Sequence, residues 1–552
     1  MGNIGNGYGI LCDFMKNTTT RLTIIIFGLL CTVFLCCLKL TYNIIPGFTV
    51  NYGVGGYEEF DTYYDSHNGE VYLFLPSYVN ENEFSLEKGD SVVIDNNKVN
   101  NNEIADYLDG GEHTLRMNGR EYPFVVLRGS DSVATMYIDT ESGSLKRIYK
   151  DKEIKENISL RINDSTGEEC YYSDFGHDTM SGHGNTTWEL YAKKPFTITL
   201  EEPASILSMN KSDKLVLIAN SIDLTNLRNK FAYEMVRRSC SSVWAPDSRY
   251  VDVYINGQYQ GLYLLCQKPT AYNSGLSERE YYVELLAQNI KEIKSDHNGT
   301  DDAEYVTDRM REVNNIIVSN SIEKTFEVID KDSWAEKYLI DEVLLNHDGA
   351  IASQFYHFGD NSKVYAGPSW DYDKIFGAYY WVSNPNTLFA IRRGFMNDNW
   401  YSFLYRNEEF FSEVCNKYQC RIRPNMLKIY FDIDSMYEEI YDSAYMNSKR
   451  WDVNLFEEDL MYLKNFIRER IDFLDRAWIN KENTYYVEVQ TGINYKSYTV
   501  FDIMTVEELF TKEQIDVPID NLIYRDTGQS VHKNDVISSE YTVIDDVRYI
   551  GD

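Results

Sequence analysis

Residues 367–377 read GPSWDYDKIFG and place two aspartates, Asp371 and Asp373, inside an apolar frame that is rich in turn residues. Carboxylates in an apolar frame are costly unless a positive partner compensates them. That partner is a metal ion, a lysine, or simply water around a solvated turn. The stretch alone does not distinguish these three alternatives, so the other motifs of the chain are needed.

Composition narrows the class of protein. The chain has 552 residues, 86 acidic against 53 basic side chains, a formal net charge of −33 and 43% hydrophobic residues. The hydrophobic content is that of a globular protein, and the length suggests about three or four domains. A strongly acidic surface repels phosphate backbones, so a nucleic acid polymer is excluded as a partner. An anionic substrate such as ATP would need a local basic patch or a divalent metal.

The N-terminal region predicts a membrane anchor. Residues 22–38 read LTIIIFGLLCTVFLCCL without a charge, and the apolar character continues to residue 45. The alternative is a cleaved signal peptide, but no small-residue cleavage site follows. The length suits a bilayer. Lys16 and Arg21 precede the run, so residues 1–21 are expected in the cytoplasm and the main domains outside, as a single-pass membrane protein.

Strand and helix patterns divide the remainder into three parts. Residues 50–150 alternate short strands and turns and predict a small β-rich domain. Residues 155–484 begin with strands and end with helices, which predicts a two-lobed α+β domain with a cleft between the lobes. Residues 485–552 return to strands and predict a small β-rich module.

Four elements of the two-lobed part are the clearest, one hairpin and three helices. The pair Asn256-Gly257 lies between two strand patterns and predicts a tight hairpin. Residues 225–239 predict a helix that Asp223 is placed to cap. Residues 332–346 and 457–479 predict the clearest helices of the helix-rich part.

Four stretches carry candidate chemistry. Gly182 and Gly184 free the backbone to approach an anion, and Lys193 and Lys194 follow, although a glycine-rich hairpin with a surface lysine pair is the bland alternative. Arg228 lies in the first turns of the helix after Asp223, where an ordinary surface arginine is the alternative.

The other two stretches are acidic. Asp348 follows a helix and is placed to accept a hydroxyl proton, with His347 as a neighbouring candidate. Asp371 and Asp373 supply the hard oxygen ligands that suit Mg²⁺.

The order of these stretches indicates a protein kinase. A glycine-rich turn, strand lysines, a helix, a hairpin, a second helix, an isolated aspartate and a carboxylate turn follow one another as in that fold. The strings HRD and DFG are absent from the sequence, which excludes a typical eukaryotic kinase.

Six motifs, in order, resemble the CotH kinase family, which is named for a spore-coat protein. They cover more than half of the chain, from about residue 181 to residue 478. The motifs are HGNTTWELYAKKP (183–195), DLTNLRN (223–229), VDVYINGQYQGLY (251–263), the N-x-D of Asn346 and Asp348, WDYDKIFG (370–377) and LKNFIRERIDFL (463–474).

The resemblance implies an atypical kinase-like fold that uses ATP and Mg²⁺ to phosphorylate Ser or Thr of a protein, with a Ser-rich acceptor as a possible substrate. Asp348 would be the catalytic base, and Asp371 would hold the metal together with Asp373 and Gln354. The residues expected at the nucleotide are Gly182, Gly184, Asn185, Arg228 and either Lys193 or Lys194.

Three positions depart from the family or from kinases in general. His183 stands where the family has arginine, which weakens the grip on phosphate or on a helix. Gln267 stands where many members have an acid, and Gln354 stands where many kinases use asparagine for a second metal.

Two alternative functions stay open. One is a non-catalytic surface protein that uses a kinase-like scaffold for binding, which the acidic charge and the flanking β-rich modules favour. The other keeps the nucleotide site but transfers a nucleotidyl group. The acceptor protein and the oligomeric state do not follow from the sequence.

Overall fold

The computed structural model describes residues 46–53, 58–87, 92–277, 280–286, 289–295, 303–319, 322–346, 353–378, 383–391, 400–453, 455, 457–491, 494–539 and 541–546. Within these residues no helix has the length and apolar character needed to cross a bilayer. The anchor expected at residues 22–45 lies outside the described residues.

The chain forms two compact units, of which the first comprises Met1–Leu75 and Val79–Leu127. It is built from two sheets, ordered β2-β1-β5 and β3-β4-β9-β8-β6-β7. Their strands are β1 (Thr49–Tyr52), β2 (Glu58–Asp61), β3 (Tyr63–Asp65), β4 (Glu70–Leu75), β5 (Phe84–Leu86), β6 (Val92–Ile94), β7 (Asn97–Val99), β8 (Glu112–Met117) and β9 (Arg120–Arg128). This unit is therefore built mainly of β-strands.

The second unit, Pro76–Tyr78 with Arg128–Asp552, begins with a closed barrel. Its strands run in the order β10-β11-β12-β13-β14-β16-β15, and β10 pairs with β15 in parallel. The barrel interior is apolar and includes Met136, Leu160, Ile198 and Val253. The strands are β10 (Ala134–Thr140), β11 (Glu156–Asn163), β12 (Glu169–Gly182), β13 (Phe196–Ala204), β14 (Ser212–Ile218), β15 (Ser248–Ile255) and β16 (Gln258–Gln267).

The start of the barrel differs from the sequence-based boundary. The strand ATMYIDT was expected in the domain at residues 50–150, but it forms β10 of the barrel. Its parallel partner β15 follows more than a hundred residues later, and pairing over that separation leaves no local sequence pattern. The hairpin expected at Asn256-Gly257 is present, and both residues have positive φ, +49° and +76°, as a type I′ turn requires.

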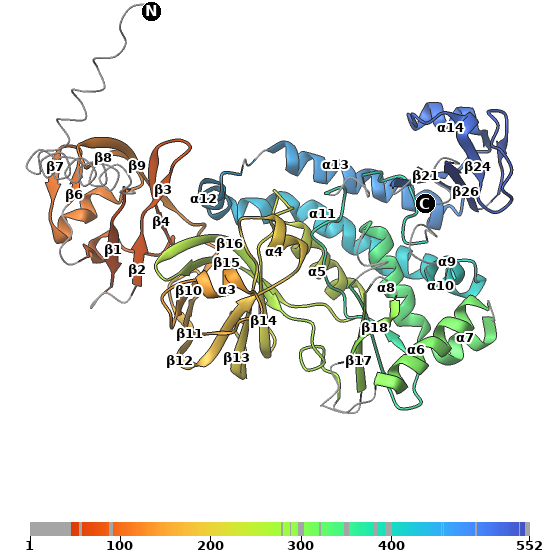
Figure 1. Cartoon of the computed structure of the whole chain (residues 1–552), viewed down its shortest axis with the longest axis horizontal. Coiled ribbons are helices and arrows are strands. Elements are labelled where there is room, and N and C mark those ends of the chain that lie inside the picture. The colour runs from red at the N-terminus through yellow and green to blue at the C-terminus, as the bar shows by residue number, and fades with distance from the viewer. Residues whose placement is uncertain are drawn as a thin grey trace, which may run out of the picture. The chain divides into compact units, whose positions relative to one another are not determined.

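Helices follow the barrel and share one large apolar core that includes Trp334, Tyr338, Phe466 and Trp478. A small sheet, β18-β17-β19-β20, adjoins them. Figure 1 shows α5 between the barrel and α11, and these two helices contact each other.

The other elements that precede the C-terminal residues are two short helices within the barrel sequence, the helices of the large core and the small sheet. They are α3 (Lys146–Lys150), α4 (Thr186–Leu190), α5 (Arg228–Ser239), β17 (Glu280–Leu286), β18 (Asn289–Ser295), α6 (Ala303–Val318), α7 (Ile322–Val328), α8 (Lys331–Val343), β19 (Gln354–Gly359), β20 (Tyr365–Ala366), α9 (Trp400–Leu404), α10 (Glu408–Lys417), α11 (Arg423–Glu438), α12 (Tyr441–Trp451) and α13 (Glu457–Leu474). The helices expected at 225–239, 332–346 and 457–479 correspond to α5, α8 and α13.

The C-terminal residues form a small module with its own apolar core around Val487, Leu509 and Ile544. Its main sheet has the order β22-β21-β26-β24. The elements are β21 (Tyr485–Thr491), β22 (Asn494–Val500), β23 (Met504–Thr505), α14 (Val506–Lys512), β24 (Leu522–Tyr524), β25 (Val536–Ile537) and β26 (Tyr541–Asp546). Mixed helix and sheet content makes the chain an α+β protein, as expected.

Candidate active site

The two aspartates of WDYDKIFG lie on a turn that follows β20, and we call residues 367–377 the carboxylate turn. Asp371 and Asp373 are partly exposed and flank Tyr372, which is fully buried. Asp371 has a φ of +70° and Phe376 a φ of +48°. Residues other than glycine adopt this conformation when the surroundings enforce it, and such positions cluster at functional sites.

The start of α5 holds the carboxylate turn in place. The backbone N–H of Tyr372 donates to Oδ1 of Asn229 at 3.0 Å. Arg228 donates from Nε to the carbonyl of Ile375 at 3.0 Å. The rings of Phe231 and Phe376 meet edge to face with centroids 5.2 Å apart. Three residues in the first turn of one helix therefore fix the backbone that carries both aspartates.

Asp223 explains why the motif DLTNLRN begins with an acid. Its carboxylate accepts the backbone N–H of Arg228 at 2.7 Å and pairs with the Arg228 guanidinium at 2.5 Å. Both side chains are buried. Leu227 occupies the N-cap position of α5 and makes no side-chain cap, whereas the Asp223 carboxylate accepts the N–H of Arg228, the first residue of the helix. Asp223 also orients the Arg228 side chain, which bonds the carboxylate turn. In this structure Arg228 contacts protein groups of the turn, and its predicted place at the nucleotide stays a prediction.

A second segment reaches the carboxylate turn from β19. Ser353 donates from Oγ to Oδ2 of Asp371 at 3.1 Å, and the next residue, Gln354, is buried at the start of β19. Asp348 and His347 lie outside the described residues. The residue before them, Asn346, is buried and donates to Oδ1 of Asp341 at 3.3 Å.

The glycine-rich turn at residues 182–185 closes β12 and is held by Lys152. Lys152 donates from Nζ to the carbonyl of Gly184 and to Oδ1 of Asn185, both at 2.7 Å. Gly184 has a φ of +71°. A side chain at Gly182 would lie 2.5 Å from Cβ of Lys152 and 2.8 Å from the Trp188 ring. Both glycines are thus required by the turn itself.

The lysine pair is engaged by the protein. Lys193 is buried, donates from Nζ to the carbonyl of Leu262, and lies over the Tyr263 ring at 4.3 Å. Burial lowers the pKa of Lys193 to about 7. Lys194 is half-buried and donates from Nζ to the carbonyl of Trp188. A contact of either lysine with phosphate stays a prediction.

His183 joins the two turns. Its Nδ1 lies 3.1 Å from Oγ1 of Thr197, and its ring meets Trp370 of the carboxylate turn edge to face at 6.2 Å. Burial, together with the positive charges of Lys268 and Lys152, lowers the pKa of His183 to about 3. The imidazole is therefore neutral at physiological pH and carries none of the charge of the arginine found in the family.

Gln267 also has a structural explanation. Its Oε1 accepts the backbone N–H of Asp247 at 3.1 Å, and its Nε2 donates to the carbonyls of Asn210 and Lys211 at 3.3 and 3.4 Å. An ionised acid at this position could not donate to those carbonyls. The departure from the family pattern is thus compensated locally.

The donor set around the carboxylate turn suits magnesium. Asp371 and Asp373 present two carboxylates, and the Ser353 hydroxyl bonds to Asp371, while Gln354 is the next residue along the chain. The predicted place of Gln354 at the metal stays a prediction. Mg²⁺ is typically bound through one or two carboxylates plus substrate phosphates. No cluster of three or more His, Cys, Asp or Glu side chains suited to a metal occurs among the described residues, which do not include Asp348.

A buried ion pair fixes the segment that follows the turn. Arg470 of α13 and Glu342 of α8 are fully buried and 2.7 Å apart. Arg470 also donates to the carbonyls of Pro385 and Thr387, while Glu342 accepts the backbone N–H groups of Phe389 and Ala390 at 2.7 and 2.8 Å. Arg470 is the second of the two arginines in the motif LKNFIRERIDFL, and the sequence analysis assigned it no role.

Some of these residues could not be identified from the sequence. Asn229 and Trp370 lie within quoted motifs, so their positions were visible but their partners were not. Lys152 and Ser353 belong to no motif. Both act through contacts with residues that are distant in the sequence or on another element, and a single sequence gives no signal for such contacts.

A glycine-rich turn on a β-barrel, in contact with a carboxylate turn beside a helical core, is the arrangement of a kinase-like domain. The family model described as CotH kinase protein matches residues 180–474, which is more than half of the chain. The chain belongs to the CotH kinase family and is a kinase-like protein. No match to a curated protein is found.

Proposed function

We propose that this protein transfers the γ-phosphoryl group of ATP to Ser or Thr hydroxyls of protein acceptors. The proposal rests chiefly on one observation: the start of α5 holds two carboxylates on a strained turn, next to the glycine-rich turn. Fixed carboxylates beside a backbone turn suited to anions are what phosphoryl transfer requires, because its catalysis consists mostly of positioning and charge stabilisation.

Each part of the site has a role in this proposal. Asp371 and Asp373 would hold Mg²⁺, which would neutralise negative charge on the phosphates. Gly184 and Asn185 would face the phosphates with backbone N–H groups. The N–H of Gly182 donates to the carbonyl of Lys152 at 2.8 Å, so Gly182 would contribute only the space for close approach. Asp348 would accept the proton of the acceptor hydroxyl. Arg228, Asn229 and Ser353 position the carboxylate turn, since their bonds go to the turn itself.

The reaction is tested by incubating the full chain in detergent with Mg²⁺, a Ser-rich protein acceptor and ATP labelled on either the γ- or the α-phosphate. We expect the acceptor to gain only the γ-label, and Asp348→Asn to lose this transfer. Gain of the α-label would identify nucleotidyl transfer instead. Equal γ-transfer by wild type and Asp348→Asn would contradict the proposal.

We further propose that residues 22–45 anchor the protein and that the main domains lie outside the cytoplasm. The uncharged run and the basic residues before it support this topology. Protease added to intact cells should digest the main domains and spare residues 1–21. Protection of the main domains in intact cells would contradict this topology.

A non-catalytic scaffold is the second candidate, favoured by the neutral His183 and by the two lysines bound to backbone carbonyls. Mg-ATP separates the two functions through stability. A nucleotide site should raise the free energy of unfolding by about 2.7 kcal/mol when the ligand is 100-fold above its dissociation constant. No change with Mg-ATP, together with no transfer, would favour the scaffold.

A further inference from the structure

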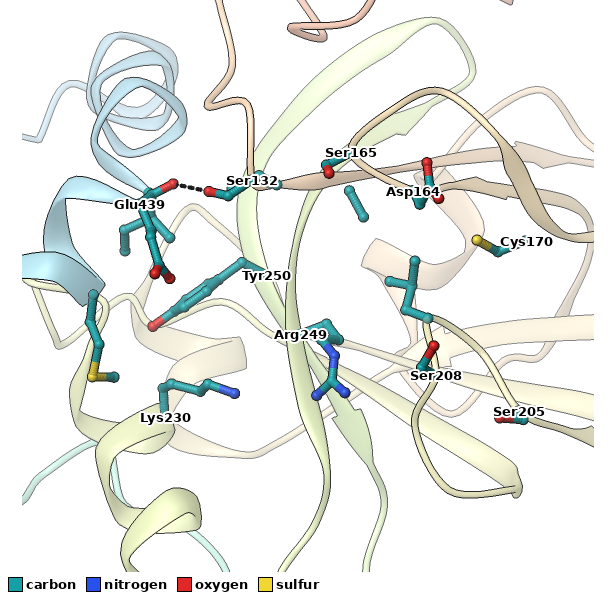
Figure 2. Close-up of a pocket in the computed structure, with 15 residues that line it drawn as sticks. Ser132, Asp164, Ser165, Cys170, Ser205, Ser208, Lys230, Arg249, Tyr250 and Glu439 are labelled. Atoms are coloured by element: carbon teal, nitrogen blue, oxygen red, sulfur yellow. Dashed lines mark hydrogen bonds between the residues drawn. The ribbon is translucent and has the colours of Figure 1, made fainter. Parts of the chain in front are cut away.

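A cavity of about 570 Å³ lies at one end of the barrel, and we call it the barrel-mouth cavity. Its walls come from the starts of β10, β12 and β15, the ends of β11 and β13, one residue of α5, and the junction of α11 and α12. Figure 2 shows the polar residues around it. The mouths of β-barrels are preferred ligand sites, and ligand pockets typically measure about 300–1,000 Å³.

This cavity is separate from the candidate active site. The glycine-rich turn closes the end of β12 and β13 starts just after it, whereas the cavity lies where β12 starts and β13 ends. The two sites are therefore at opposite ends of the same strands. Neither Asp371 nor Asp373 lines the cavity. A ligand bound here would not occupy the place of the nucleotide.

Two cations enter the cavity from adjoining elements. Lys230 of α5 donates to Oε1 of Glu234 at 3.2 Å and to the carbonyl of Ser248 at 3.0 Å. Arg249 of β15 uses one nitrogen, Nη1, for Oδ1 of Asp247 at 2.9 Å and for the carbonyl of Ser248 at 2.8 Å.

The other guanidinium nitrogens, Nε and Nη2, have no hydrogen-bond partner among the residues that the structure describes. Figure 2 shows the Arg249 side chain between Lys230 and Ser208. Because its side chain is 37% exposed, Arg249 keeps donors for an incoming anion.

The remaining lining is suited to hydroxyl groups and to a flat apolar face. Ser165 and Ser208 line the cavity with hydroxyls. Tyr250 also lines the cavity, and its ring is fixed because its hydroxyl donates to the carbonyl of Asn226 at 2.7 Å. Oδ1 of Asp164 accepts hydrogen bonds from Thr166 within its own loop, and Glu439 is exposed at the junction of α11 and α12.

We propose that the barrel-mouth cavity binds a small anionic saccharide, whose phosphate or carboxylate group meets Arg249 while its hydroxyls meet the serines and its ring face meets Tyr250. A guanidinium with spare donors recognises either anion, and the cavity volume fits a ligand of one or two sugar rings better than a folded partner. This site goes beyond phosphoryl transfer and does not depend on it.

Calorimetric titration of the full chain with glucose 6-phosphate, glucuronate and glucose tests the proposal. We expect one or both anionic sugars to bind and glucose not to bind. Binding of glucose 6-phosphate alone assigns the anion as a phosphate monoester, and binding of glucuronate alone assigns it as a carboxylate. Arg249→Gln should weaken binding about tenfold or more, as expected for loss of a charged hydrogen bond. Arg161→Gln, on the outer face of the barrel, is the matched control and should bind normally.

A second measurement needs no variant. Cys170 lines the cavity and is exposed, whereas Cys420 is exposed elsewhere on the helical side. The bound sugar should slow alkylation of Cys170 by iodoacetamide and leave the rate at Cys420 unchanged, as measured by peptide mass spectrometry. Absence of binding by both anionic sugars, undiminished binding by Arg249→Gln, or equal alkylation of Cys170 with and without the sugar would overturn the proposal.

Discussion

The carboxylate turn and the glycine-rich turn are fixed in opposite ways. In the carboxylate turn, neighbouring elements bind the backbone and the buried Tyr372, so that Asp371 and Asp373 stay partly exposed. Near the glycine-rich turn, charged side chains hold the structure together, since Lys152, Lys193 and Lys194 all donate hydrogen bonds to backbone carbonyls. The charged side chains of the carboxylate turn are therefore partly exposed, whereas those near the glycine-rich turn bind the protein's own backbone.

Under the proposed function, the partly exposed aspartates act on a ligand and the bonded lysines hold the shape of the protein. A charged residue in a motif is a candidate for either role, and the structure distinguishes the two by what the side chain contacts. Four substitutions test whether neighbouring elements hold the carboxylate turn in place and whether the lysines have a structural role.

The largest effect is expected at the buried pair that fixes the segment after the carboxylate turn. Arg470→Met should lower the free energy of unfolding by about 3–5 kcal/mol, because it leaves Glu342 buried without its partner. Urea unfolding measures this. Arg468→Met, exposed on the same helix, should change stability by about 0.5 kcal/mol or less. Equal stability of the two variants would show that the pair does not support this region.

At the carboxylate turn, Asp371→Asn should lower the rate of γ-phosphoryl transfer by about 10²–10³-fold, the usual cost of losing one electrostatic group at an active site. Its stability should hardly change, because asparagine tolerates the positive φ of this position. The control is Asp516→Asn, exposed in the C-terminal module, which should transfer phosphate normally. A fully active Asp371→Asn would remove the distinction between the turns.

The role of Lys193 can be tested through pH. Its folded-state pKa of about 7 lies below the unfolded value of 10.5, so the unfolded chain binds more protons between these values and stability rises with pH there. From pH 7 to 9 the wild type should gain about 2 kcal/mol relative to Lys193→Met, since one pKa unit is worth about 1.4 kcal/mol.

Asp252, the charged neighbour of Lys193, has a pKa raised by burial to about 6 and stays ionised over this interval. A flat difference between wild type and Lys193→Met from pH 7 to 9 would mean that Lys193 is not desolvated and is available to a ligand.

The smallest effect is expected for the single hydrogen bond from α5. Asn229→Ala leaves the N–H of Tyr372 without its acceptor and should cost about 1 kcal/mol of stability, the lower end of the range for an unsatisfied buried donor. Thermal unfolding measures the loss, with Asn315→Ala on the exposed face of α6 as the control. If the two variants have the same melting temperature, the turn does not depend on this hydrogen bond from α5.

Local patterns in the sequence were sufficient for part of the fold. The hairpin at Asn256-Gly257 and the helices α5, α8 and α13 follow from residues within one element. The barrel was not predicted, because the pairing that closes it joins β10 to β15, two strands that are far apart in the sequence. In the candidate site, the motif predicted Asp371 as a metal ligand, and this stays a prediction. Ser353 and Lys152 were not singled out, because their partners lie on other elements.

The parallel pairing of β10 with β15 also sets the order in which this lobe can be completed during synthesis. β10 leaves the ribosome first, yet the strand that closes the barrel beside it begins only at Ser248. Until then the growing chain carries an open sheet with unpaired edge groups, which are prone to pair with other chains. A product truncated before β15 would therefore be an aggregation-prone fragment rather than a smaller folded domain.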